Sequence, residues 1–224
     1  MYATGGTVTR DTARRSLERD SIQALVALSC ARTTNGVSSP RTGKECWIHM
    51  VVLQGKRVLL RPGRPEDADR LFQIRNEPEV VRWWGSVDLE EEISEEFIEA
   101  DDGFVIEANR EVVGAIQYCE ENEPMYRHAG IDIFLTTSRH GQGLGTEAIR
   151  VLAQYLFEER GHHRLTIDPA ADNTVAIRAY ERVGFRRVGI MRKYERGPNG
   201  VWHDGLLMDM LLEEFRPNTR TIHK

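Results

Sequence analysis

The sequence predicts a mixed α/β fold in which helices flank a central sheet. Three observations lead to this prediction. Short segments with strand patterns alternate with helical segments along the chain. Two pairs of strand segments are separated by turn signals, at residues 109–110 and 197–200. A glycine-rich loop, residues 141–145, joins an apolar strand to a strongly helical segment.

The first half of the domain is expected to contain a strand, two helices and a hairpin. Alternation of apolar and polar residues predicts the first strand, which Pro62 ends. Apolar residues recur at helical spacing in the next two segments, and Asn109-Arg110 forms the turn of the hairpin. In chain order these elements are expected at residues 56–62, 67–76, 88–100, 103–107 and 112–120.

The second half is expected to alternate strands and helices before a final hairpin. Pro169 stops one strand, and Asp172 or Asn173 caps the helix that follows it. Gly184 suits the C-terminal end of that helix. In chain order these elements are expected at residues 130–135, 146–160, 164–167, 173–182, 186–194 and 201–212.

The chain is expected to hold one domain with an extension on each side. Basic residues outnumber acidic ones near the N-terminus, and residues 11–31 have the pattern of an amphipathic helix. A Ser/Thr/Gly/Pro-rich stretch follows, which is typical of a linker, and Met50 is an equally sensible start. The expected parts are an extension, the domain and a short tail, at residues 1–49, 50–217 and 218–224.

Length and composition exclude several classes of protein. A chain of 224 residues with 40% hydrophobic content can bury a sizeable core. A net charge of −5 without a basic stripe argues against nucleic acid as a partner. Three widely spaced cysteines indicate neither a disulfide framework nor a metal site, so a cytoplasmic location is expected. No apolar run approaches the roughly 20 residues that span a bilayer, so no membrane partner is expected.

The glycine loop has the chemistry of a phosphate site. Gly141, Gly143 and Gly145 allow a ligand to approach the backbone closely, and the helix start supplies unpaired N–H donors. The spacing fits neither a dinucleotide fold nor a nucleotide triphosphatase. A turn that merely ends the strand explains the glycines equally well.

A second motif lies downstream on a helix pattern. It reads Asn173-x-x-Ala176-x-x-x-Tyr180-x-x-x-Gly184-Phe185. Together and in this order, the two motifs resemble the acetyl-CoA site of the GNAT acetyltransferase superfamily. The resemblance extends over most of the domain, and two ordered motifs are far more specific than either alone.

The resemblance implies a fold, a co-substrate and a set of contacts. The implied fold is the GNAT type, a mixed and largely antiparallel central sheet flanked by helices. The implied co-substrate is acetyl-CoA, whose pantetheine arm would lie where two strands part beyond the loop. His140 stands where the family has Arg or Gln, and Arg139 lies one residue earlier. The implied cofactor-binding residues are Phe134, Leu135, Arg139, His140, Gly141, Gln142, Gly143, Leu144, Gly145, Thr146 and Asn173.

A narrower resemblance indicates the acceptor. Residues 81–85, 130–132, 143–146 and 168–173 together resemble aminoglycoside 6'-N-acetyltransferases, which are antibiotic-resistance enzymes. This implies an acid on the central strand, an Asp-Pro turn facing the drug and a tyrosine in the next helix. The corresponding residues are Asp132, Asp168 and Tyr180.

Acetyl transfer to an amine gives two of these residues a chemical role. An alkyl amine has a pKa near 10.4, so a carboxylate must hold the ammonium and receive its proton. Asp132 is the candidate because it interrupts an apolar strand, although an outward-facing Asp paired with an arginine would fit the same pattern. Tyr180 is two helical turns beyond Asn173 and either protonates the leaving thiolate or is a core aromatic residue. Asn173 either caps its helix and also bonds the pantetheine amide, or serves as a cap alone.

The acceptor side is less sharply indicated. Asp168 is either an amine anchor or a turn residue. Trp83 and Trp84 either wall the substrate or close the core between helices. The acidic run 88–102 is either a solvated helix face or a field that concentrates a polycation. His162-His163 has no partner at metal-ligand spacing and is expected in a surface turn without zinc.

The predicted function is transfer of acetyl from acetyl-CoA to a small-molecule amine, most specifically an aminoglycoside, by direct attack in a ternary complex. Asp132 and Tyr180 are the catalytic candidates, and the substrate-binding candidates are Trp83, Trp84, Asp132 and Asp168. The alternatives are acylation of a protein N-terminus or a siderophore precursor, or a non-catalytic domain that binds acetyl-CoA. A monomer and a homodimer are both compatible with the sequence.

Overall fold

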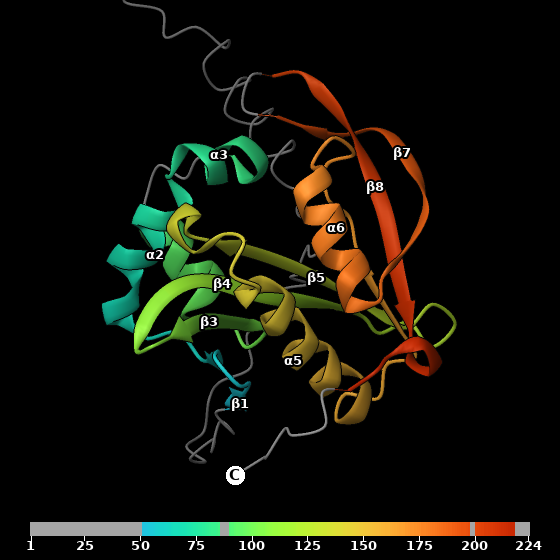
Figure 1. Ribbon diagram of the computed structural model, residues 1–224, viewed down its shortest axis with the longest axis horizontal. Coiled ribbons are helices and arrows are strands. Elements are labelled where there is room, and N and C mark those ends of the chain that lie inside the picture. The colour runs from blue at the N-terminus through green and yellow to red at the C-terminus, as the bar shows by residue number, and fades with distance from the viewer. Residues whose placement is uncertain (1–50, 86–89, 198–199, 218–224) are drawn as a thin grey trace, which may run out of the picture. The chain divides into compact units, whose positions relative to one another are not determined.

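The computed structural model describes residues 51–85, 90–197 and 200–217, and the side chains of these residues apart from 90 and 91. The expected N-terminal extension, the tail and part of the acidic run lie outside the described residues. Eight strands form one sheet (Figure 1). The strands are β1 (Leu53–Gln54), β2 (Leu59–Arg61), β3 (Gly103–Ala108), β4 (Glu111–Glu121), β5 (His128–Leu135), β6 (Arg164–Ile167), β7 (Arg186–Arg196) and β8 (Trp202–Leu211).

The sheet is mixed and largely antiparallel, which confirms the predicted fold class. Its strand order is β1-β2-β3-β4-β5-β6-β8-β7, and β5 with β6 is the parallel pair. The β3–β4 hairpin turns where predicted, and its two turn residues, Asn109 and Arg110, both have positive φ. Two consecutive turn residues with positive φ give the turn a twist that matches the right-handed twist of the strands it joins.

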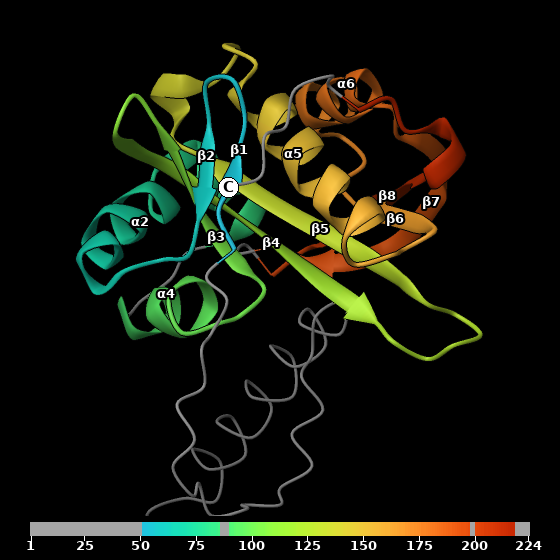
Figure 2. The same cartoon turned by 90° about the horizontal axis from the view of Figure 1, so that it is seen from below.

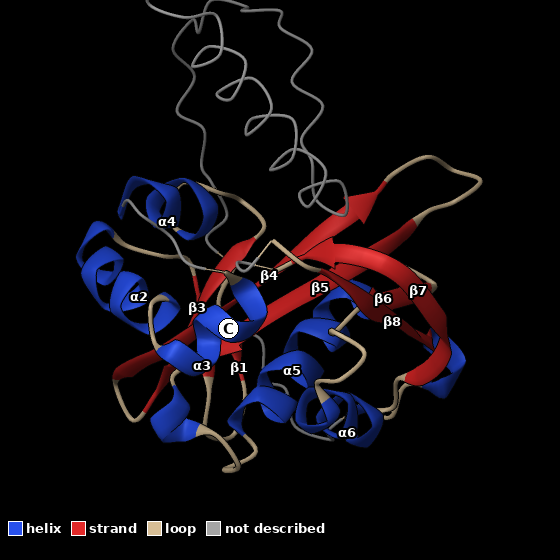
Figure 3. Ribbon diagram, turned by 90° about the horizontal axis from the view of Figure 1, so that it is seen from above, coloured by secondary structure: helices blue, strands red, loops and turns tan. Residues whose placement is uncertain are grey.

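Helices cover both faces of the sheet. The α-helices are α2 (Ala68–Arg75), α3 (Pro78–Trp84), α4 (Glu90–Phe97), α5 (Leu144–Glu158) and α6 (Thr174–Val183). Figures 2 and 3 show α5 and α6 on one face and α2 and α4 on the other. Each face has its own buried cluster, a large one under α5 and a smaller one under α2 and α4. No helix in the described ranges is long and apolar enough to cross a membrane.

The two parallel strands part soon after they begin to pair. β5 and β6 are paired only at Ala129↔Leu165 and Gly130↔Thr166. On its other edge β5 continues to pair with β4 as far as Leu135↔Gly114. Residues 131–135 of β5 therefore have no strand partner on the β6 side, as the family resemblance implied.

Sequence reasoning missed one helix. The α3 segment was singled out only for its tryptophans, yet Pro78 at the first helical position starts a helix that ends at Trp84, with Gly85 at φ +72° as its C-cap. The same segment is only seven residues long, too short for a helical periodicity to stand out. The helix brings both tryptophans to the parted strands.

Candidate active site

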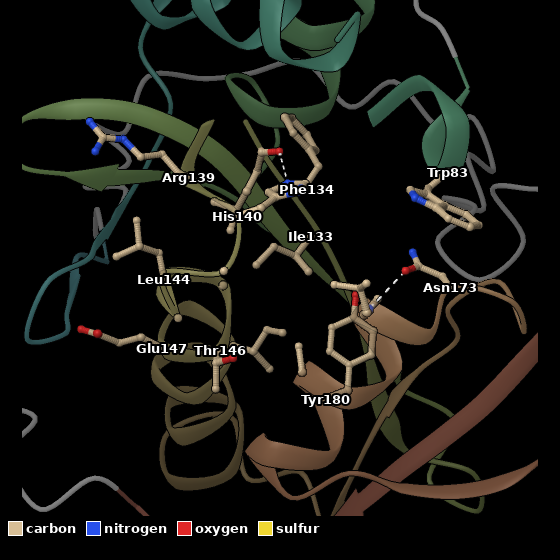
Figure 4. A pocket seen from close by; sticks show the side chains of 18 of the residues that line it. Trp83, Ile133, Phe134, Arg139, His140, Leu144, Thr146, Glu147, Asn173 and Tyr180 are labelled. Carbon is tan, nitrogen blue, oxygen red and sulfur yellow. Dashed lines mark hydrogen bonds between the residues drawn. The ribbon is translucent and has the colours of Figure 1, made fainter. Parts of the chain in front are cut away.

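A cavity of about 860 Å³ opens where β5 and β6 part (Figure 4). The end of β5, the glycine loop, α5 and α6 line it, and α3 adds Trp83 and Trp84. The unpaired edge of one strand and the starts of two helices therefore face a single space.

The glycine loop has the backbone that a phosphate site requires. Gly141 and Gly143 have φ of +72° and +77°, and Gly143 is the N-cap of α5. A Cβ on Gly145 would stand 3.0 Å from a methyl group of Leu135, so the loop lies tightly against the strand. The first N–H groups of α5 have no intrahelical acceptor, and they carry the positive end of the helix dipole. The loop thus has the main-chain donors that a diphosphate site requires.

Most of the predicted cofactor residues line this cavity, but Gln142 does not. Its side-chain amide donates to Ser138 O at 3.1 Å, and its main-chain carbonyl accepts from Arg57 Nη1 at 2.8 Å. Arg139 lines the cavity while pairing with Glu111. His140 Nε2 lies 3.0 Å from the carbonyl oxygen of Leu135 (Figure 4).

The free edge of β5 is therefore not wholly unpaired. Trp84 Nε1 donates to Ile133 O at 3.2 Å, and His140 contacts the carbonyl two residues further along. Side chains of α3 and of the loop thus cover two carbonyls that face the gap.

Two residues of the second motif face the cavity from α6. Asn173 caps the helix, accepting from Ala176 N at 3.1 Å. Figure 4 shows the Tyr180 phenol pointing toward Ile133. Burial raises the pKa of Tyr180, and the negative fields of Asp132 and Asp168 raise it further. The phenol therefore stays protonated at neutral pH.

Asp132 lies on the opposite face of β5 from Ile133, directly across from Gln117 on β4. Burial raises the pKa of Asp132 to about 7, and the charges of Asp168 and Glu96 add to this effect. A hydrogen bond from Gln117 opposes it. In the described part of the chain no arginine or lysine forms an ion pair with this carboxyl, so the alternative of an outward Asp paired with an arginine is not supported.

Further carboxyls surround Asp132. Burial raises the pKa of Glu195 on β7, and the charge of Asp168 adds to the shift. Burial likewise raises the pKa of Glu96 on α4, whose carboxylate accepts from Gln117 Nε2 at 3.4 Å. Glu96 belongs to the predicted acidic run, so at least this part of the run faces the acid cluster. The cluster is thus four carboxyls, Asp132, Asp168, Glu96 and Glu195.

A bulge in β7 brings one more polar group to the cluster. Between Met191 and Glu195 the pairing with β8 shifts, and Lys193 has φ +50°. The ring of Tyr194 then lies over Gly205, and burial together with a hydrogen bond to Asp168 raises the pKa of its phenol. Gly205 also bridges to Ala170, which holds the Asp-Pro turn beside β8.

The two tryptophans have different surroundings. Trp84 packs edge-on against Phe134 with ring centroids 5.2 Å apart, and the Arg75 guanidinium lies 4.9 Å from its ring. Trp83 stacks under Arg82 and points into the cavity (Figure 4). Trp84 therefore closes the core between helices as well as lining the cavity, whereas Trp83 is not packed into the core in this way.

One expectation was wrong. His162 is not in a surface turn: it is buried, and its Nε2 lies 2.6 Å from Glu120 Oε1. His163 is exposed as expected. The strand register that brings Glu120 to His162 is a long-range feature that the local pattern does not contain.

Sequence reasoning also missed Gln117, Glu195 and Tyr194. Gln117 is identified only by the β4–β5 register, and the other two only by the β7 bulge. Alternation along β7 would have assigned Tyr194 and Glu195 to opposite faces without indicating that either approaches Asp168.

The chain is similar in sequence and in fold to known acetyltransferases. The model of the "Acetyltransferase (GNAT) domain" matches residues 57–186. The aminoglycoside N(6')-acetyltransferase type 1 of Klebsiella pneumoniae is 30% identical over 59% of this chain and 75% of its own length. The spermidine N(1)-acetyltransferase of Escherichia coli K12 is 27% identical over 73% and 91%. The solved structure of AAC(6')-Ib in complex with paromomycin and acetyl-CoA superposes with a TM-score of 0.59 at 26% identity, over 71% of this chain and 96% of that one.

Proposed function

The chain belongs to the acetyltransferase (GNAT) domain family and is an acetyl-CoA-dependent N-acetyltransferase, and from this premise we propose that its acceptor is the 6'-amino group of an aminoglycoside. The acceptor would be held by the four-carboxyl cluster around Asp132. An aminoglycoside carries several ammonium groups, so a site with several carboxyls complements it. A cytoplasmic location, where the chain would meet acetyl-CoA, belongs to the same proposal.

The observation that carries the proposal is the environment of Asp132. Its carboxyl is partly buried, it has three acidic neighbours, and its pKa is raised to about 7. Each like charge in a poorly solvated site is costly unless a cation arrives. The site is therefore short of positive charge, which one or more ammonium groups of the substrate would supply.

The same environment prepares Asp132 to act as a base. A carboxyl that titrates near neutral pH accepts a proton from an ammonium more readily than one with an ordinary pKa. As the amine attacks the thioester carbonyl, an N–C bond forms and Asp132 receives the proton. The main-chain N–H and C=O of Ile133 both point toward the gap between β5 and β6. This N–H would stabilise the oxyanion that forms on the thioester carbonyl.

Tyr180 completes the reaction in this scheme. When the C–S bond breaks, the leaving thiolate needs a proton, and the protonated phenol of Tyr180 lines the cavity. Tyr180 would donate that proton, while Asp168 and Trp83 hold the rest of the acceptor. No side chain is acetylated.

A polyamine is the second candidate acceptor. The four-carboxyl cluster recognises ammonium groups without contacts that require a sugar, and the spermidine acetyltransferase matches more of this chain than the aminoglycoside enzyme does. A linear polyamine would place its cations along the same cluster.

Thiol release separates these acceptors. The protein is mixed with acetyl-CoA and, in turn, with kanamycin, tobramycin, spermidine or a peptide. The proposal expects fast release with the two drugs and at most slow release with the peptide. Faster turnover of spermidine would select the second candidate. Release with the peptide alone would overturn both, and cofactor binding without any release would indicate a silent domain.

A further inference from the structure

The turn between β1 and β2 places a cation against the glycine loop. Arg57 precedes β2, and its main-chain N–H donates to Glu147 Oε1 at 2.6 Å. Its Nε donates to Glu147 Oε2 at 2.9 Å, and its Nη1 donates to Gln142 O at 2.8 Å. Two hydrogen bonds thus fix this guanidinium, one to α5 and one to the loop, and the third ties the Arg57 main chain to α5.

Glu147 is a buried anchor for Arg57. It lies in the first turn of α5 with 8% of its surface exposed, and its main-chain N–H donates to Gly143 O at 3.1 Å. A Cβ on Gly55 would stand 2.8 Å from Glu147 Oε1, so the turn fits closely over the carboxylate. A buried carboxylate that pairs in two places leaves its partner little freedom.

The third guanidinium nitrogen of Arg57, Nη2, remains available to a ligand. Nη2 of Arg57 donates to no described residue, and it stands 3.3 Å from where a Cβ of Gly143 would be. Gly143 is the residue from which α5 starts. Arg57 also lines the cavity together with the glycine loop. One donor edge is therefore held beside the amides of the helix start.

The charge of the cavity favours an anion. Six basic side chains line it against three acidic ones, although the whole chain carries −5. Two of these cations have other partners close by: Arg139 pairs with Glu111, and Arg150 donates to the carbonyl of Arg182. Arg57 is paired as well, with Glu147, but this pairing and its bond to Gln142 O hold it beside the start of α5.

We propose that Arg57 is a phosphate-binding residue for acetyl-CoA, with Glu147 as the residue that positions it. The donor edge of the guanidinium supplements the main-chain donors with a fixed positive charge. This inference rests on the co-substrate and not on the acceptor, so failure of the aminoglycoside proposal leaves it intact.

Binding measurements without any acceptor test it. We expect Arg57→Gln to weaken calorimetric binding of CoA at least about tenfold, as loss of a charge-assisted hydrogen bond would. Pantetheine, which lacks every phosphate, should bind wild type and variant equally in an NMR titration at millimolar concentrations. Dephospho-CoA assigns the contact: a retained penalty places Arg57 at the diphosphate, and a lost penalty places it at the 3'-phosphate.

A matched ion pair controls for a purely structural effect. The side chains of Arg160 and Glu120 are 43% and 13% exposed, close to the 54% and 10% of the Arg57 and Glu147 side chains. Arg160 follows the C-terminal end of α5, at the opposite end of the helix from the glycine loop. Arg160→Gln should leave CoA affinity unchanged. Arg57→Lys keeps the charge but not the planar set of N–H donors, so it should lose less CoA affinity than Arg57→Gln. It replaces Arg57→Gln in the test if that variant does not fold. Unaltered CoA binding in Arg57→Gln, or an equal loss of pantetheine, would overturn the proposal.

Discussion

At the scale of single residues, the raised pKa of Asp132 predicts a pH profile. Burial and neighbouring charges bring it to about 7 in the free enzyme. Activity expressed as kcat/KM should therefore rise as pH passes through about 7 and this carboxyl ionises. Asp132→Asn should lose this limb and reduce turnover by roughly 10²–10⁴-fold, the usual contribution of a general base. A variant that kept the wild-type limb would assign the titration to another group.

The same residue predicts a cost in stability. The folded pKa lies above the ordinary value of 3.8, so ionisation is harder in the folded chain. The resulting loss of stability is absent below about pH 4, grows up to about pH 7 and is complete above it. Asp132→Asn should therefore raise the free energy of unfolding at pH 8 by roughly 2–4 kcal/mol, but not at pH 4. Urea titrations at both pH values measure this, and an equal change at both would contradict the assignment.

At the scale of elements, the start of α6 carries the next prediction. Asn173 accepts from Ala176 N and lines the cavity, so a cap and a ligand contact are both open to it. Asn173→Ala should cost about 1 kcal/mol of stability, whereas Asn173→Asp keeps the cap. We expect Asn173→Asp to melt like wild type yet bind CoA more weakly. If its CoA affinity were unchanged, the residue would be a cap alone.

The β7 bulge predicts an effect confined to the acceptor. A Cβ on Gly205 would stand 2.8 Å from Cδ1 of Tyr194, so Gly205→Ala must displace the ring that reaches Asp168. We expect the KM for the amine to rise several-fold with little change in the KM for acetyl-CoA, and Tyr194→Phe to act alike. Gly189→Ala, on β7 with nothing within 4 Å of the added carbon, is the control. Equal effects of the two alanine variants would show that the bulge does not matter.

Local sequence signals predicted the elements better than they predicted the acceptor site. The hairpin turn at Asn109-Arg110, the loop at Gly143 and the cap at Asn173 depend on nearest neighbours, so their residue types revealed them. Gln117 and Tyr194 meet the acid cluster through strand register and a bulge, which no short window encodes. His162 was assigned to the surface because the partner that buries it comes from β4.

At the scale of the whole molecule, charge is divided between two regions. Basic side chains outnumber acidic ones around the cavity, while the Asp132 cluster is acidic. Both substrates are therefore attracted by long-range fields that salt screens, with a Debye length of about 8 Å at 0.15 M. Raising the ionic strength should increase the KM for acetyl-CoA and for the amine, with a smaller change in kcat. Initial rates at several salt concentrations check this, and a KM insensitive to salt for either substrate would contradict it.

The brief pairing of β5 with β6 has a thermodynamic consequence. In the sheet, two residue pairs between β5 and β6 connect the five strands β1 to β5 with the three strands β6, β8 and β7. The cavity begins where this pairing ends. A carrier that lodges there binds the native chain and not the unfolded one, so at a hundred times its dissociation constant it adds about 2.7 kcal/mol to the stability of the protein. The melting temperature of the protein therefore rises with the concentration of the acyl carrier. When the carrier is scarce, the protein is less stable, and the stability is lost where β5 and β6 part.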